Sequence, residues 1–209
     1  MERTLVLKNL FKLLSLALLS FAASQAHAQA GADALVRQIS VDVINTAKTD
    51  KAVQGGDLAR IQSLVESKVM PHVNFEVVTR SAVGPQWRSA TPEQRGLLQT
   101  EFKTLLIRVY AGAISQLGDQ SVEVTKTLPV SGSKQVVVQT EVRGKGEPIK
   151  LDYRLDQPAD GSWKIIDVNV GGLWLVQNYR SQFAQELGKG GIDGLIATLA
   201  ERNKAAGKS

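Results

Sequence analysis

The sequence predicts an α+β domain in which helices cover one face of a curved antiparallel sheet of about four strands. Three observations support this prediction. Segments with helical periodicity come first and last, four segments rich in Val and Ile lie between them, and residues 149–156 alternate strictly between apolar and charged side chains. A sheet with one apolar face needs a cover, and the flanking helices supply it.

The first 28 residues have the parts of a signal peptide. A positively charged start is followed by an apolar run over residues 13–23 and by a small-x-small cleavage motif at residues 26–28. The apolar run is too short to cross a bilayer as a mature helix. We expect cleavage after Ala28, which leaves a single soluble periplasmic domain of residues 29–209; an uncleaved membrane anchor is the alternative.

The composition excludes several classes of protein. The chain has no cysteine, so it has no disulfide framework, no thiol chemistry and no lipid-modified N-terminal cysteine. Without residues 1–28, 22 basic residues face 19 acidic ones. A nucleic-acid-binding domain would need clustered Lys and Arg, and this mild positive charge falls short of that.

Three helices are predicted before the longest one. Helical spacing of apolar residues covers residues 33–48, 58–69 and 75–83. Gly55-Gly56 separates the first helix from the second, and Pro71 separates the second from the third. Trp87 follows as a predicted packing anchor for the next loop.

The longest helix is predicted to begin at Thr91. Thr91 is a good N-cap, Pro92 suits the first helical position, and Gln94 completes a capping box. A helix of about 26 residues would be roughly 39 Å long, which is enough to wall one side of a small domain. Its apolar stripe consists of Leu98, Phe102, Leu105, Leu106, Val109, Ala113 and Leu117.

Four strands are predicted over residues 121–128, 135–143, 149–156 and 163–170. The third strand has one apolar and one charged face, which is typical of an antiparallel sheet with one side in water. The residues expected to form the apolar face are Val136, Val138, Val142, Ile149, Leu151, Tyr153, Leu155, Ile166, Val168 and Val170. Gly171-Gly172 then predicts a sharp turn, and helices over residues 175–187 and 192–203 close the chain around a GKGG break.

These elements predict a half-barrel similar to the nuclear-transport-factor-2-like and cystatin-like arrangements. Periodicity shows which faces are apolar but cannot show whether they enclose space. A closed, dry core and an apolar ligand cavity therefore both fit the pattern.

Four segments carry a resemblance to a known family. They are GPQWRSATPEQRGLLQTEFKTLLIRVY (residues 84–110), DYRL (152–155), WKIIDVNVGG (163–172) and LVQNYRSQF (175–183). In this order, and over residues 35–199, the chain resembles the MlaC family, also described as the toluene-tolerance family. That family provides the periplasmic phospholipid-binding component of the Mla lipid-transport pathway.

The resemblance implies a carrier without enzymatic chemistry and without a cofactor. Its cargo would be a diacyl phospholipid, with the acyl tails between sheet and helices and the headgroup at the mouth. The implied partners are an outer-membrane lipoprotein and porin complex and an inner-membrane ABC transporter with its substrate-binding membrane subunit. Shuttling between them would maintain the lipid asymmetry of the outer membrane.

The apolar faces and the resemblance together name the candidate lipid-binding residues. Those on helices are Phe75, Val78, Phe102, Leu105, Leu106, Val109, Tyr110 and Ile114, and those on the sheet are Val136, Val138, Leu151, Tyr153, Val168 and Val170. Trp174, Leu175, Tyr179 and Phe183 are expected to form one rim. Members of the family often have a small residue where this chain has Trp174, and the larger ring would either narrow the mouth or alter the choice of lipid.

Headgroup contacts are harder to assign. Arg80, Arg88, Arg143, Lys145 and Arg180 lie in predicted loops or at element ends, where they could attract a phosphate or simply remain solvated. No headgroup motif is present, which favours recognition of the tails.

Three alternatives stay open. Folds of this shape also host enzymes with a carboxylate and a tyrosine in an apolar pocket, for which Asp152, Asp167, Tyr110 and Tyr153 are available. His72 is the single histidine after residue 28, so the chain has too few histidines for a His-based metal site and only one candidate for a catalytic triad. The other two alternatives are a carrier for another lipid such as a hopanoid, and a structural domain with a closed core.

Overall fold

An antiparallel sheet and a set of helices make up residues 31–205, the part of the chain that this computed structural model describes. The predicted signal peptide lies outside the described residues. A helix over residues 31–49 comes first. The elements that follow are α2 (Lys51–Gln54), α3 (Leu58–Lys68), η1 (Met70–His72), α4 (Phe75–Val83), η2 (Gly84–Ser89), α5 (Pro92–Ser115), η3 (Leu117–Asp119), β1 (Ser121–Pro129), β2 (Val136–Arg143), β3 (Ile149–Asp156), β4 (Lys164–Val170), β5 (Leu173–Trp174) and α6 (Leu175–Ala205).

The sheet has five strands in the order β1-β2-β3-β4-β5, and all neighbours are antiparallel. The α+β prediction is therefore confirmed, with one strand more than expected. The fifth strand has only two residues, too few to show an alternating pattern. Gly171 and Gly172 make the predicted turn into it, with φ angles of 58° and 96°, which glycine adopts without a steric cost.

An irregularity in the pairing of β3 with β4 corrects one predicted face. Arg154 lies opposite Asp167, but Leu155 lies opposite Ile165, so Ile166 is an extra residue. Such a bulge moves the residues beyond it to the other face. The prediction that Ile166 belongs to the apolar face was wrong, and Ile165 takes its place there.

Helix α5 begins as its sequence predicts. The Thr91 hydroxyl accepts a hydrogen bond from the Gln94 backbone N–H at 3.1 Å, and the Gln94 side chain accepts one from the Thr91 N–H at 3.0 Å. These reciprocal bonds satisfy two donors that a helix start leaves free. The predicted break near the C-terminus occurs at Gly191, where φ is 62° and ψ is −156° inside α6.

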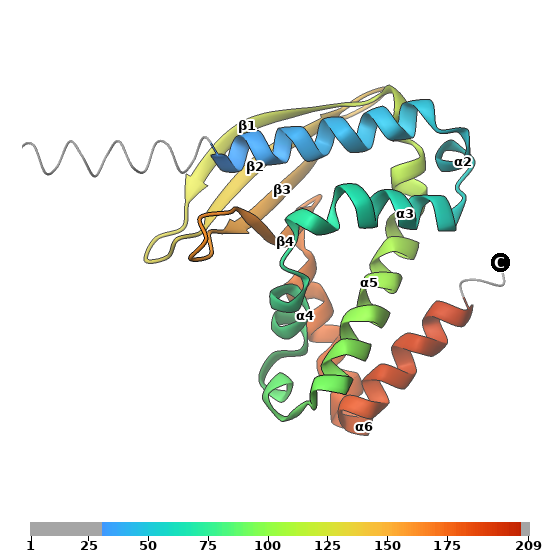
Figure 1. The fold of residues 1–209 in the computed structure, drawn as a ribbon, viewed down its shortest axis with the longest axis vertical. Helices are drawn as coiled ribbons and strands as arrows, with labels where there is room; N and C mark the ends of the chain where they lie inside the picture. Colours follow the sequence, from blue (N-terminus) through green and yellow to red (C-terminus); the bar gives the residue numbers. More distant parts are fainter. Residues whose placement is uncertain (1–30, 206–209) are drawn as a thin grey trace, which may run out of the picture.

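The helices belong to two groups, which Figure 1 shows above and below the middle of the molecule. The helix over residues 31–49 crosses the sheet, with α3 beside it, and both pack on the upper half of α5. The lower half of α5 packs with α4 and α6 in a separate core centred on Phe102. The Phe102 ring lies 4.9 Å from Tyr179 and 5.0 Å from Phe183, measured between centroids.

Candidate functional site

Two apolar chambers lie between the inner face of the sheet and the helices that cover it. The larger has a volume of about 270 Å³ and the smaller about 150 Å³. They adjoin along a common wall formed by Val65, Val69, Val73, Leu106, Ile107, Ile165 and Val168. We refer to the two together as the apolar cavity.

The apolar cavity draws its lining from both halves of the fold. The larger chamber adds Ile39, Ser40, Val43, Ile44, Ile114, Leu117, Val122, Val142, Leu151 and Tyr153 to the common wall. The smaller adds Met70, Phe75, Val78, Phe102, Lys103, Asp167 and Leu175. The cavity therefore extends from the helix over residues 31–49 to the start of α6.

Four polar side chains border the cavity, and three of them have a hydrogen-bond or ion-pair partner within the protein. The Ser40 hydroxyl donates to the Val36 carbonyl oxygen at 2.7 Å. Lys103 and Glu66 form an ion pair at 2.8 Å. Asp167 accepts two backbone hydrogen bonds, and the fourth side chain is Tyr153.

Tyr153 lies in the wall of the larger chamber, where little water reaches its hydroxyl. Burial raises the pKa of Tyr153 to about 12, and the nearby Ser40 side chain offsets only part of that effect. The phenol therefore stays neutral at any physiological pH. It gives the chamber a polar atom but no charge.

Asp167 ties β4 to the start of α6. Its Oδ1 atom accepts hydrogen bonds from the Val168 N–H at 2.9 Å and the Val176 N–H at 3.0 Å. Burial raises the pKa of the Asp167 carboxyl, while these bonds and the charge of Arg154 act in the opposite direction. The carboxylate thus fixes the backbone at the start of α6, and Asp167 borders both the smaller chamber and a groove on the other side of the sheet.

The structure does not bring the four candidate catalytic groups together. Tyr153 borders the larger chamber and Asp167 the smaller, while Asp152 and Tyr110 border neither. Asp152 lies on β3 between Gln139 and Asn169 of the neighbouring strands. Across residues 31–205, no group of three His, Cys, Asp or Glu side chains is placed to hold a metal ion.

Half of the residues predicted to bind lipid lie in the cavity wall. They are Phe75, Val78, Phe102, Leu106, Ile114, Leu151, Tyr153, Val168 and Leu175. The other half lie elsewhere: Leu105, Val109, Tyr110, Val136, Val138, Val170, Trp174, Tyr179 and Phe183.

The predicted residues that lie outside the cavity wall face the solvent, a packed core or a groove. On α5 the cavity-facing stripe runs through Leu106 and Ile107, so Val109 points outward with 54% of its surface exposed. Val136 and Val138 are buried in the closed core between the sheet and the helix over residues 31–49. Instead of forming a rim, Tyr179 and Phe183 fill the aromatic core around Phe102, and Trp174 borders a groove outside the cavity.

The sequence prediction missed the contribution of the first helices. Ile39, Val43 and Ile44 line the larger chamber, and Val65 and Val69 line both. A signal was available, because both segments have helical apolar periodicity. The periodicity identified these segments as helices with one apolar face, but it did not show that this face lines a cavity.

None of the predicted headgroup residues borders the apolar cavity. Arg143 pairs with Glu123 at 3.0 Å and with Glu141 at 2.8 Å, and Lys145 is exposed in the turn after β2. Arg80 and Arg180 border the outer groove, and Arg88 joins them in a neighbouring depression.

Comparisons with known proteins agree with this geometry. A family model described as MlaC protein matches residues 37–201. The toluene tolerance protein ttg2D of Pseudomonas putida is 27% identical over 146 residues, covering 66% of this chain and 67% of its own. The intermembrane phospholipid transport system binding protein MlaC of Haemophilus influenzae is 22% identical over 199 residues, covering 93% of each chain.

A solved structure resembles the whole described fold. The phospholipid-binding protein from Ralstonia solanacearum, solved in complex with a phospholipid, matches with a TM-score of 0.79 and 40% sequence identity. The match covers 84% of this chain and 98% of that one. Among the helices of residues 31–205, none is long and apolar enough to cross a membrane.

Proposed function

Because the chain belongs to the MlaC family, we propose that it is a periplasmic phospholipid carrier whose apolar cavity holds the acyl chains. The Ralstonia solanacearum protein, 40% identical, was solved with a phospholipid, which supports this cargo. The signal-peptide pattern of residues 1–28 supports export and cleavage.

The observation that carries the proposal is the chemistry of the cavity wall. Valine, leucine and isoleucine dominate it, and three of its four polar side chains are engaged by the protein itself. A polar substrate would lose its hydrogen bonds to water there and gain few in return. An acyl chain has none to lose, so the wall favours tails over headgroups.

The energetics fit a carrier that must also release its cargo. Each buried methylene contributes about 0.8 kcal/mol, so two tails of roughly 15 carbons would nominally give about 24 kcal/mol. This exceeds the practical ceiling for noncovalent affinity, about 18 to 21 kcal/mol, and the cost of ordering two flexible chains lowers the net value. Release then requires a way to open the cavity.

Opening would separate the sheet from its covering helices. The helix over residues 31–49 lies over the sheet with α3 beside it, and both helices border the larger chamber. Contact with a membrane complex would favour the separated state. The proposed partners are an outer-membrane lipoprotein and porin complex and an inner-membrane ABC transporter, and the protein performs no chemical step on the lipid.

Native mass spectrometry of the gently purified protein, followed by organic extraction, tests the proposal. A diacyl phospholipid in near-stoichiometric amount is the expected result. A hopanoid would identify a carrier for another lipid. Protein without lipid that also fails to take up added phospholipid would contradict the proposal and restore the structural-domain alternative.

A further inference from the structure

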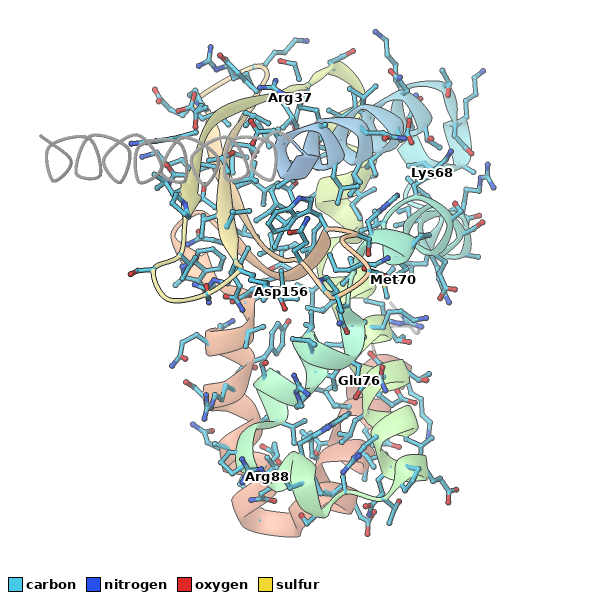
Figure 2. All side chains as sticks on the ribbon, turned by 60° about the vertical axis from the view of Figure 1, so that its left-hand side comes forward. Arg37, Lys68, Met70, Glu76, Arg88 and Asp156 are labelled. Atoms are coloured by element: carbon cyan, nitrogen blue, oxygen red, sulfur yellow. The ribbon has the colours of Figure 1, made fainter. Side chains whose placement is uncertain are left out.

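A second, polar groove lies outside the apolar cavity, where the outer face of β3 and β4 meets α4 and α6. It has a volume of about 570 Å³. Figure 2 shows one of its residues, Asp156, at the end of the sheet nearest the lower helices. The charged side chains that border the groove are Arg80, Arg154, Arg180, Asp156 and Asp167.

Arg154 is held in a fixed orientation. Its guanidinium carbon lies 4.4 Å from the centroid of the Trp174 ring. Its Nε atom is buried and has no hydrogen-bond partner. Stacking on an aromatic face leaves the N–H edges of a guanidinium free to bind in its own plane. The buried Nε–H is out of a ligand's reach, but within residues 31–205 the terminal N–H groups of Arg154 make no hydrogen bond, so they are the unused donors in the groove.

The other two arginines are likewise uncommitted. Within residues 31–205, none of Arg80, Arg154 and Arg180 forms an ion pair or donates a side-chain hydrogen bond. Arg180 lies against Gly84, where an added Cβ would come within 3.4 Å of its Nε atom. Arg80 and Arg180 also border the adjoining depression of about 340 Å³, which adds Arg88.

The two carboxylates offset only part of this cluster, because three arginines against two aspartates leave a formal charge of +1. One oxygen of Asp167 is occupied by the Val168 and Val176 N–H groups. Asp156 lies opposite Lys164 in the register of β3 and β4, but the Lys164 ammonium donates to the Pro71 carbonyl oxygen at 2.8 Å, and within residues 31–205 Asp156 forms no ion pair. The arginines outnumber the carboxylates, so a bound anion would balance the remaining positive charge.

We propose that this groove binds a phosphate group through Arg154, Arg80 and Arg180. A carboxylate has two oxygens and can be satisfied by one bidentate arginine. A phosphate has more oxygens and more negative charge, and it suits several guanidiniums that approach from different elements. The phosphate belongs either to a soluble ester or to the headgroup of a bilayer lipid. The site is separate from the apolar cavity and does not depend on lipid being bound there.

The indole N–H of Trp174 is the reporter for a titration with inorganic phosphate, followed by NMR at constant ionic strength. We expect a saturable shift of this signal and none of Trp163, with signals assigned from Trp→Phe variants. Arg154→Gln and Arg180→Gln should each weaken binding roughly tenfold or more, because each removes charge-assisted hydrogen bonds. Arg180 is exposed, so its replacement preserves the fold even if Arg154→Gln does not.

Arg143→Gln is the matched control, since Arg143 is exposed and already paired with Glu123 and Glu141. It should leave phosphate binding unchanged. Three results would overturn the proposal: no saturable shift at millimolar phosphate, equal binding by acetate, or unchanged binding in both groove variants.

Flotation with phosphatidylglycerol vesicles distinguishes the two sources. Co-flotation that free phosphate suppresses and Arg180→Gln weakens identifies a bilayer headgroup as the ligand. Saturable phosphate binding without co-flotation identifies a soluble phosphate ester. Extraction of the lipid from the apolar cavity is measured separately, so failure of this site and failure of the carrier function remain distinguishable.

Discussion

The ammonium of Lys103 lies 2.8 Å from a carboxylate oxygen of Glu66, and this ion pair joins α5 to α3 beside the smaller apolar chamber. Lys103 is the single lysine or arginine in the wall of either chamber within residues 31–205. The hydrogen bond from Lys103 lowers the pKa of the Glu66 carboxyl. The Glu66 carboxyl therefore stays ionised at neutral pH.

Breaking this pair should affect lipid exchange more than stability. Because both side chains are partly exposed, Lys103→Gln should cost less than about 1 kcal/mol of unfolding free energy. If α3 and α5 separate during release, the variant should exchange fluorescent phospholipid faster. Glu66→Gln should do the same, and the double variant should add nothing. Lys189→Gln breaks the remote Lys189–Glu186 pair on α6 and is the control; equal acceleration there would rule out a local effect.

Filling the cavity should expel the lipid. Leu106 borders both chambers, so Leu106→Trp replaces acyl-chain space with a ring. We expect less than half the wild-type lipid per protein after extraction. Val109→Trp is the matched control, because Val109 lies less than one turn further along α5 and is 54% exposed. Equal lipid content in the two variants would show that the lipid does not occupy the chambers.

A reversible covalent lock should stop exchange. The Thr127 hydroxyl on β1 donates a hydrogen bond to the Asp33 carboxylate, so these side chains meet across the sheet and the helix over residues 31–49. The double variant Asp33→Cys and Thr127→Cys introduces the first cysteines into the chain. Oxidised protein should retain its lipid during incubation with acceptor vesicles, and reduced protein should release it. Equal release by both forms would show that this helix does not move away from β1.

The aromatic core should dominate the stability of the lower helices. Phe102 is fully buried and contacts both Tyr179 and Phe183. Phe102→Ala should cost about 3 to 5 kcal/mol of unfolding free energy, measured by urea denaturation. Leu97→Ala, at a position 44% exposed on the same helix, should stay within about 0.5 kcal/mol. A cost below about 1 kcal/mol for Phe102→Ala would show that the core readily collapses around the gap.

Tyr153 should make stability depend on alkaline pH. Its pKa is raised from 10.0 to about 12 in the folded protein, so the unfolded state loses the phenolic proton first. The stabilising contribution is complete below pH 10 and is lost as the pH rises toward 12. The slope of unfolding free energy against pH reports how many protons the unfolded state has lost relative to the folded state. In Tyr153→Phe, that number should be smaller by one in this pH window. An unchanged slope would place the hydroxyl in water.

Local signals account for the elements that the sequence predicted well. The Thr91 capping box, the alternation over residues 149–156 and the glycine pair at 171–172 each specify backbone conformation within a few residues. Their physical causes are local hydrogen bonds, alternating side-chain direction and access to positive φ. Family membership was also recognisable, because it rests on sequence segments.

Half of the candidate lipid-binding residues required the tertiary structure for their placement. The bulge opposite Arg154 sends Ile165 rather than Ile166 inward. The rotation of α5 exposes Val109, and the packing of α6 draws Phe183 into a closed core.

By itself, the sequence determined the approximate bounds of the longer helices and of four strands, most of their apolar faces, and the family to which the chain belongs. Only the tertiary structure decided that apolar faces enclose space between sheet and helices, and that Arg80, Arg154 and Arg180 meet outside it. The reason is that periodicity records the direction of each side chain relative to its own element. The distance between elements depends on how all of their side chains pack together.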